Sequence, residues 1–175
     1  MSRNQPYTRE QLSKIAQESC RKMRQRVMNY RKKNHTYELL ISTKVGFWDP
    51  PRVVVTCASN VPPFLRETKH QASSLKKCHP TLSSAYQDVG LQVGRPVDRK
   101  LRTISGLAYW VPGHCAEPHA ANALLNRMKN ASVQIKIDNI VFGLAFNVSN
   151  QTPKPYCGTC RLVFPQLNKD GKVFK

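Results

Sequence analysis

The stretch that most restricts the fold of this chain covers residues 133–148, which are apolar over most of their length. A strand with one face in water alternates apolar and polar side chains, so a nearly continuous apolar run indicates a strand that is covered on both faces. Helices packed on the two sides of a sheet provide such cover. We therefore expect an α/β protein that contains this strand.

The elements before this strand fit the same class. Residues 8–33 have the spacing of a basic amphipathic helix. β-Branched residues at 37–47 and 52–58 predict the two strands of a hairpin, which the sequence WDPP connects. Residues 59–105 contain several prolines and glycines, and we interpret them as an insertion near the functional site. A single domain over residues 1–175 accommodates all of these elements.

One helix is expected before the apolar strand in the chain, and another after it. Pro118 suits the first turn of the first helix, whose buried face contains Ala120, Leu124, Leu125 and Met128. The sequence CGTC at residues 157–160 begins the second helix, and Pro165 should end or kink it. The element order is then helix, hairpin, insertion, helix, strand and helix, which predicts a sheet with helices on its faces.

The chain is strongly basic, with 28 lysines and arginines against 10 acidic residues and a formal net charge of +18. Such a surface attracts polyanions, of which nucleic acid is the commonest, and a charge that serves only solubility is the alternative. A calmodulin-binding or membrane-surface role for the basic helix at 8–33 is the weaker interpretation. The residues expected to contact nucleic-acid phosphates are Arg21, Lys22, Arg24, Arg26, Arg31, Lys32 and Lys33.

No apolar run approaches the roughly 18 residues that a membrane span needs, and the first residues lack the apolar core of a secretory signal. We therefore expect a protein of the cytoplasm, or one with access to the nucleus, that binds no membrane. The six cysteines then indicate metal or redox chemistry more than a disulfide framework.

Three of the cysteines, Cys115, Cys157 and Cys160, precede expected helices. A helix N-terminus stabilises a thiolate, and thiolate is the form that binds zinc. Three protein ligands leave the fourth position of the ion open, which is typical of catalytic rather than structural zinc. Glu117 would then accept a proton from a zinc-activated water molecule and pass it to a leaving group.

The sequences HCAE at residues 114–117 and PYCGTC at 155–160 together resemble the zinc-dependent nucleoside and nucleobase deaminase superfamily, in the form found in bacterial toxin domains that act on nucleic acids. The resemblance covers about residues 103–165 and implies one Zn²⁺ per chain on Cys115, Cys157 and Cys160, with Glu117 as the proton shuttle. It also implies a three-layer α/β/α cytidine-deaminase-like fold. In that fold a mixed central sheet of about four strands is flanked by helices, and GKVFK at the end of the chain is the expected short fourth strand.

The chain departs from the superfamily pattern in the residue before Cys157. The superfamily has proline there, whereas Pro155 is here followed by Tyr156. His114 lies one residue out of register with the histidine ligand of other branches, so we do not expect it to bind the metal. A thioredoxin-like redox pair and a purely structural zinc site are the other interpretations of the CGTC motif.

The resemblance and the charge together predict hydrolytic deamination of cytosine to uracil in a polynucleotide, with DNA preferred to RNA. Tyr109, Trp110 and Tyr156 are expected to stack on a base, with His114 and Arg161 as further substrate contacts, although Tyr109 and Trp110 suit core packing equally well. A free cytidine deaminase and a non-enzymatic, zinc-stabilised nucleic-acid-binding module are the alternatives. We expect a monomer, and the toxin-like motifs fit a domain that is delivered into another cell.

Overall fold

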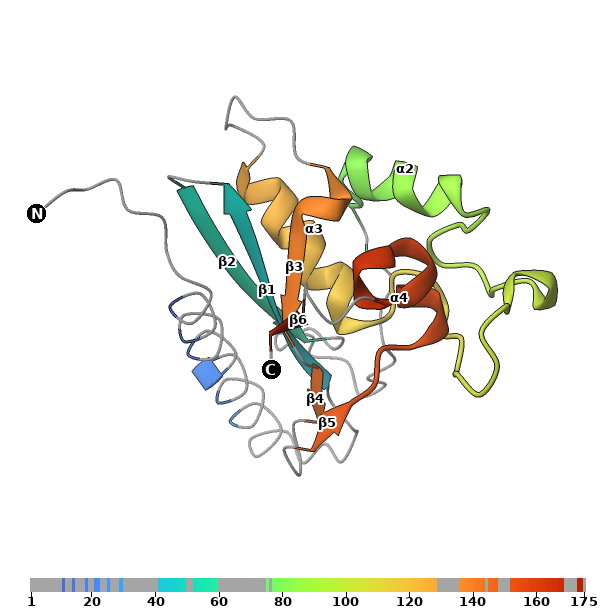
Figure 1. Cartoon of the computed structure of the whole chain (residues 1–175). Coiled ribbons are helices and arrows are strands. Elements are labelled where there is room, and N and C mark those ends of the chain that lie inside the picture. The colour runs from blue at the N-terminus through green and yellow to red at the C-terminus, as the bar shows by residue number, and fades with distance from the viewer. Residues whose placement is uncertain are drawn as a thin grey trace, which may run out of the picture.

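The computed structural model describes residues 41–49, 52–59, 75, 77–128, 136–143, 145–147, 152–168 and 173–174, together with seven residues between Gln11 and Asn29. Its strands are β1 (Ile41–Asp49), β2 (Arg52–Ser59), β3 (Ile140–Gly143), β4 (Ala145–Asn147), β5 (Pro153–Lys154) and β6 (Val173–Phe174) (Figure 1). Its α-helices are α2 (Pro80–Asp88), α3 (Ala116–Met128) and α4 (Gly158–Val163), and its 3-10 helices are η1 (Arg99–Leu101), η2 (Ile137–Asn139) and η3 (Pro165–Asn168). In these ranges no helix has the length and hydropathy that crossing a bilayer requires.

The strands form one sheet in which β1 has partners on both of its edges. One edge pairs antiparallel with β2 from Asp49 opposite Arg52 to Ser42 opposite Ser59, which confirms the predicted hairpin. The other edge pairs antiparallel with β3 and β4. Next to these lie β6, parallel to β3, and β5, antiparallel to β4. The three-layer fold expected from the resemblance stays a prediction.

The prediction of one continuous strand over 133–148 was wrong for the described residues at its start. Residues 137–139 form η2, and β3 begins only at Ile140. Asp138 and Asn139 explain the difference, because their side chains favour turns over extended backbone. The strand that follows is a core element, since Ile140 and Phe142 are completely buried. The predicted strand in GKVFK is present as β6, but it belongs to a sheet that has six strands in the described residues rather than about four.

Helix α3 packs against β1 and β2, and α2 packs against α3 (Figure 1). The predicted buried face of α3 is confirmed, because Ala120, Leu124, Leu125 and Met128 are at most 3% exposed. Helix α4 ends at Val163, two residues before Pro165, as the proline predicts.

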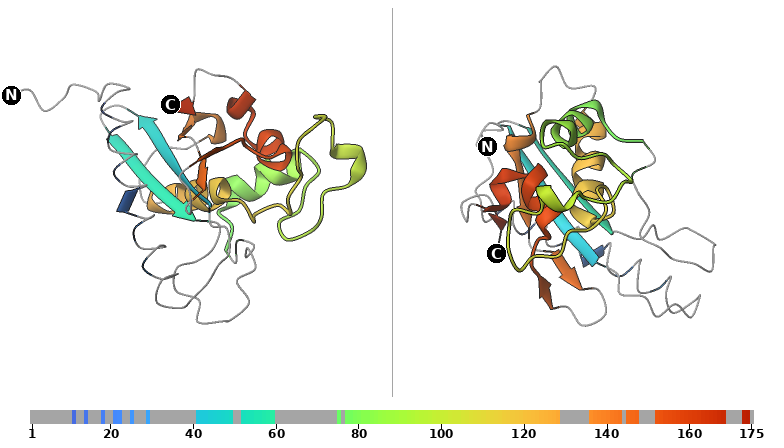
Figure 2. Two further views of the ribbon diagram at one scale, coloured as in Figure 1. Left: turned by 90° about the horizontal axis from the view of Figure 1, so that it is seen from below. Right: turned by 90° about the vertical axis from the view of Figure 1, so that its right-hand side faces the viewer.

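The described part of the expected insertion belongs to the same core as the sheet. Helix α2 begins at Pro80, and the His79 side chain caps it by accepting a hydrogen bond from the Thr81 N–H. Leu82 and Tyr86 of α2 lie in one core cluster with Phe142 and α3. Beyond α2 the chain leaves the sheet as a long loop, seen from two further directions in Figure 2.

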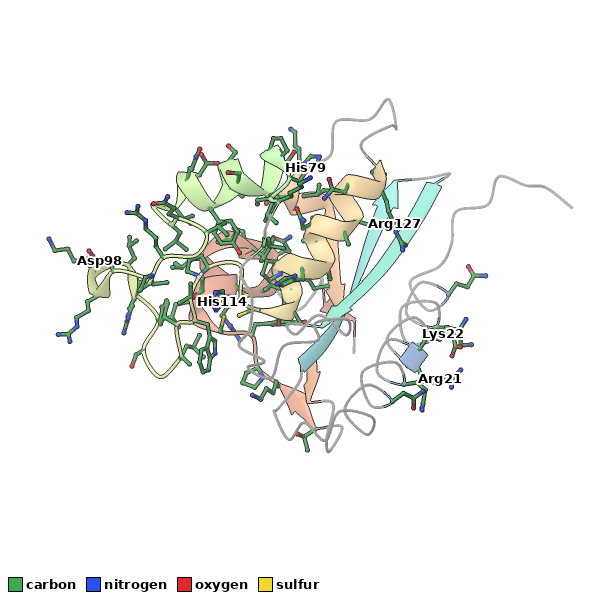
Figure 3. All side chains as sticks on the ribbon, turned by 180° about the vertical axis from the view of Figure 1, so that it is seen from behind. Arg21, Lys22, His79, Asp98, His114 and Arg127 are labelled. Atoms are coloured by element: carbon green, nitrogen blue, oxygen red, sulfur yellow. The ribbon has the colours of Figure 1, made fainter. Side chains whose placement is uncertain are left out.

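The seven described residues of the N-terminal segment are helical and exposed, which agrees with the polar face of the helix predicted at 8–33. Arg21 and Lys22 point away from the sheet (Figure 3). Both lie near Glu18, which accepts two hydrogen bonds of 2.8 Å from the Arg21 guanidinium. The other five predicted phosphate contacts lie outside the described residues: Arg24, Arg26, Arg31, Lys32 and Lys33.

Candidate metal centre

The fold brings the three predicted cysteine ligands together. Cys115 immediately precedes α3, Cys157 is the N-cap of α4, and Cys160 is the third residue of α4 rather than a residue before it. The Sγ atoms of Cys115 and Cys157 are 3.3 Å apart, and all three sulfurs lie within 4.8 Å of one another. These cysteines could therefore hold a metal ion.

The spacing and the chemistry of this donor set fit a small tetrahedral ion. Four ligands at the usual Zn–S length of about 2.3 Å place neighbouring sulfurs about 3.8 Å apart. The separations of the three cysteines lie around that value. Thiolates are soft ligands that prefer zinc, copper(I) and iron–sulfur clusters to magnesium or calcium.

Cys157 is the cysteine most ready to bind a cation. In the absence of a metal ion, hydrogen bonds from Cys115 and Cys160 lower the pKa of Cys157 to about 3. The backbone N–H of Cys160 donates to its sulfur at 3.4 Å, and the Trp110 backbone adds a further stabilising interaction. The hydrogen bond to the Cys157 sulfur raises the pKa of Cys115. Hydrogen bonds with Cys115 and Cys157, together with burial, raise the pKa of Cys160.

Glu117 lies against this cluster. It is the second residue of α3 and is only 4% exposed, and the Cys160 thiol approaches its Oε2 at 3.7 Å. Burial raises the pKa of Glu117 to about 7. A carboxyl group with a pKa near neutrality both accepts and releases protons readily, which is what general acid–base catalysis requires.

Tyr109 and Trp110 position the turn that carries Cys157 and Cys160. The Gly158 N–H donates to the Ala108 carbonyl at 2.9 Å, and the Thr159 hydroxyl donates to the Trp110 carbonyl at 2.6 Å. The ring of Tyr109 lies so close to Gly158 that a Cβ atom there would overlap it. Only glycine therefore fits at position 158 with this packing.

The turn before Cys115 is positioned by the loop that follows α2 and by α2 itself. The Gly113 N–H donates to the buried Tyr86 hydroxyl at 3.1 Å, and the Gly94 N–H donates to the Pro112 carbonyl at 3.0 Å. Gly113 has a φ of +84°, and a Cβ atom there would be 2.9 Å from the Val93 side chain. Both the backbone conformation and the space thus require glycine.

The structure corrects the prediction that Tyr156 stacks on substrate. Tyr156 is 5% exposed and belongs to the core, and its hydroxyl donates to the Gly143 carbonyl at 2.6 Å. Its ring has no exposed face for a base. Tyr156 therefore ties the start of α4 to the end of β3.

The other predicted substrate contacts differ in exposure. Trp110 is 59% exposed, and Tyr109 is half-buried with its hydroxyl bonded to the backbone of Ile104. His114 is partly buried beside the start of α3, and this burial lowers its pKa (Figure 3). Arg161 donates to the Tyr156 carbonyl and to the Asn168 side chain, both at 3.4 Å, so its described contacts are local ones.

Sequence reasoning missed Tyr86, Gly113, Gly158 and Thr159, which position the two cysteine turns. The two glycines carried a signal, because each lies one or two residues from a cysteine predicted to bind metal. Tyr86 carried none, since it lies 27 residues before the Gly113 that it contacts.

The chain was compared with protein-family models, with curated proteins and with solved structures, and none of the three comparisons found a match.

Proposed function

We propose that this protein is a zinc-dependent hydrolytic deaminase that converts cytosine to uracil in polynucleotides. The observation that carries the proposal is the buried Glu117 carboxyl group, 3.7 Å from a cysteine of a three-sulfur cluster. A structural zinc site needs no such carboxyl group, and burying one costs free energy that a catalytic role would account for.

Cys115, Cys157 and Cys160 would hold the zinc ion, which supplies Lewis acidity that makes a water molecule nucleophilic near neutral pH. Glu117 would accept a proton from that water and deliver it to the N3 atom of the cytosine ring. In the second half of the reaction it would take the second proton, from the hydroxyl group now on C4, and pass it to the departing amine. Water thus supplies the oxygen of the new carbonyl group, and ammonia leaves.

A polynucleotide substrate is favoured by charge. A net charge of +18 serves no purpose in binding a free nucleoside, whereas each phosphate that a cation neutralises adds affinity through counterion release. An aromatic side chain exposed near the cysteines also suits a base that is stacked outside a duplex. Trp110 is such a side chain.

The test compares zinc-loaded wild-type protein with Glu117→Ala, and with Asp88→Ala as a control that removes an exposed carboxylate of α2. The substrates are one cytosine-containing sequence as single-stranded DNA, duplex DNA and RNA, together with free cytidine. Mass spectrometry measures uracil formation, and zinc content is measured on the same samples.

We expect wild type and Asp88→Ala to convert the single-stranded DNA. Glu117→Ala should lose at least about 100-fold in rate while retaining one zinc per chain, in line with the usual contribution of a general acid–base group. Survival of activity in Glu117→Ala would contradict the shuttle. Turnover of cytidine alone would favour a nucleoside deaminase, and binding without conversion would favour a non-enzymatic module.

A further inference from the structure

The loop after α2 contains a second basic cluster, distinct from the N-terminal helix. Arg95, Arg99, Lys100 and Arg102 are all exposed, and we call residues 95–102 the basic loop. Asp98 is its one acidic residue, and its carboxylate accepts a hydrogen bond from the Lys100 backbone N–H at 2.9 Å. Within the described ranges, none of the four cations forms an ion pair with a carboxylate.

The basic loop is held in shape by its own backbone and by a buried anchor. The Leu101 N–H donates to the Asp98 carbonyl and the Arg102 N–H to the Arg99 carbonyl, both at 3.1 Å. Val97 is only 4% exposed and belongs to the core cluster. A binding surface that is already ordered loses less entropy when a ligand docks.

Hydrogen bonds connect the segment around the basic loop to the metal centre. On one side, the Gly94 N–H donates to Pro112, three residues before Cys115. On the other side, the Ile104 N–H donates to the Tyr109 hydroxyl at 2.8 Å. Trp110 follows directly, and its carbonyl accepts from Thr159, between the two cysteines of α4. The exposed indole therefore belongs to a residue whose backbone contacts the metal-binding turn.

The N-terminal helix offers a weaker case for phosphate contact near the metal. The Arg21 guanidinium is already bonded to Glu18, and Lys22 lies 3.6 Å from the same carboxylate. Asp98, which marks the basic loop, lies at the opposite end of the molecule from Arg21 and Lys22 (Figure 3). The left view in Figure 2 shows the same separation between the two segments.

We propose that the basic loop and the Trp110 indole form the docking surface for a single-stranded nucleic acid. Arg95, Arg99 and Lys100 contact its phosphates, and Trp110 stacks on an unpaired base next to the one that enters the metal centre. A duplex does not fit this role, because its bases are already stacked on one another. Only the entry of a base into the metal centre rests on the proposed function, and the docking surface itself does not.

The first test removes three charges from each basic region. Arg95→Gln/Arg99→Gln/Lys100→Gln is compared with Arg21→Gln/Lys22→Gln/Arg24→Gln and with wild type, all zinc-loaded. Fluorescence anisotropy of a labelled 20-nucleotide single-stranded DNA gives Kd over a series of KCl concentrations. The same sequence made as RNA identifies which strand the surface prefers.

We expect the loop variant to lower the slope of log Kd against log salt by about 2, because each phosphate contact on a single strand contributes roughly 0.7. Its Kd should rise about 10- to 100-fold in 0.1 M KCl, and the helix variant should change less. An unchanged slope in the loop variant, or a larger loss in the helix variant, would overturn the proposal. Circular dichroism and zinc content verify that each variant is folded.

The second test uses the two tryptophans of the chain, Trp48 and Trp110. Stacking on a base quenches indole fluorescence, so unlabelled oligonucleotide should quench wild type and Trp48→Phe but not Trp110→Phe. Trp110→Ala should weaken binding about 5- to 100-fold, since a base–aromatic stack contributes about 1–3 kcal/mol. Trp110→Phe, which keeps an aromatic ring, should retain most of the affinity. Quenching that persists in Trp110→Phe would overturn the stacking role.

These measurements separate the docking surface from the proposed chemistry. Binding of the oligonucleotide through the basic loop without conversion of cytosine would contradict the proposed activity and support the docking surface. Conversion of cytosine by the loop variant with an unchanged KM for the oligonucleotide would support the proposed activity and contradict the docking surface.

Discussion

The two turns that supply the cysteine sulfurs are built in different ways. The turn at residues 157–160 has two hydrogen bonds of its own, from the Cys160 N–H to the Cys157 sulfur and from the Arg161 N–H to the Cys157 carbonyl, in addition to its bonds to the Ala108 and Trp110 carbonyls. The turn at residues 111–115 has one, from the His114 N–H to the Val111 carbonyl, and otherwise depends on distant residues. Its Gly113 N–H bonds Tyr86 of α2, and its Pro112 carbonyl bonds Gly94.

This difference shows how the candidate centre combines local and long-range structure. Cys157 and Cys160 form a local pair that any chain with this spacing at a helix start can present. The third ligand reaches the pair only when α2, the following loop and α3 have packed together. The pairing of Cys157 with Cys160 therefore depends on local structure, whereas the contacts of Cys157 with Cys115 and of Cys160 with Glu117 depend on tertiary structure.

Replacing single cysteine ligands should give the largest effects on zinc affinity. Equal losses at the two turns would contradict the difference between them. We expect Cys115→Ser and Cys157→Ser to weaken zinc binding by more than about 100-fold, beyond the loss usual for an outer-shell partner. Cys157→Ser should lose more, because it destroys the local pair and removes the most acidic thiol. Competition with a chromophoric chelator measures both, with Cys78→Ser as control. Full affinity in Cys115→Ser would exclude it as a ligand.

Alanine at the glycine of each turn should have the next largest effect. Gly158→Ala places a methyl group against the Tyr109 ring, and Gly113→Ala combines a positive φ with a contact to Val93. Each should lower the free energy of unfolding by about 2–4 kcal/mol. Gly106→Ala is the control for positive φ alone, because a Cβ atom there would meet nothing within 4 Å. It should lower the free energy of unfolding by only about 1 kcal/mol.

Urea unfolding of the metal-free and zinc-loaded proteins measures these costs. A double-mutant cycle with Tyr109→Leu should relieve part of the Gly158→Ala loss, because the ring is the group that is overlapped. Strictly additive losses would show that the ring does not set the position of the turn at residues 157–160.

The carboxyl group between the two turns should make stability depend on pH. Burial raises the pKa of Glu117 from 4.5 to about 7 in the folded, metal-free protein. The folded state then binds its proton more tightly than the unfolded state, so this contribution to stability is complete below pH 4.5 and is lost as the pH rises to 7. Glu117→Gln has no carboxyl group to ionise, so it does not lose this stability as the pH rises. At about pH 7.5 the chelator-treated variant should be more stable than wild type by at most about 3 kcal/mol.

Thermal melts of wild type and Glu117→Gln at about pH 5 and about pH 7.5 test this prediction. The difference between the two proteins should grow with pH, and Asp88→Asn, on the exposed side of α2, should show no such trend. A difference that is constant with pH would mean that Glu117 titrates normally.

The smallest effect is expected for the tyrosine that positions Cys115. Tyr86→Phe removes the hydroxyl that accepts the Gly113 hydrogen bond and leaves a buried N–H without that partner. The cost should be about 1–2 kcal/mol of stability, with about a 10-fold loss of zinc affinity. The absorption spectrum of the Co²⁺-loaded variant should also shift, which a purely structural loss would not cause. Tyr109→Phe provides a matched control on the other turn.

Patterns of neighbouring residues predicted much of the structure. Two β-branched runs predicted the β1–β2 hairpin, and the CGTC spacing predicted a helix start with two nearby sulfurs. The Cys115–Glu117 offset placed an acid beside the expected ligands, and the structure brings Glu117 to the sulfur of Cys160. The hairpin, the CGTC turn and the position of Glu117 next to Cys115 in the chain depend on neighbouring residues, so local preferences suffice for them, whereas the contact of Glu117 with Cys160 joins residues 43 apart.

Patterns of neighbouring residues could not predict the contacts between residues that are far apart in the chain. Tyr156 was expected at the substrate and lies in the core, because β3 presents the Gly143 carbonyl that its hydroxyl bonds. The loop after α2 was expected only to lie near the site, which its Gly94 bond to Pro112 supports, but the residues that it contacts there could not be predicted. An aromatic or basic residue has the same local signal whether a neighbouring element covers it or leaves it exposed.

The amino-acid sequence by itself determined the chemistry available to this protein: thiols at two helix starts, an acid two residues after the first of them, and a large positive charge. Only the tertiary structure decided that these thiols meet, that burial gives the acid a pKa near neutrality, and which aromatic side chain remains exposed. The physical reason is that distance and desolvation depend on which surfaces pack together, and packing is a property of the whole folded chain.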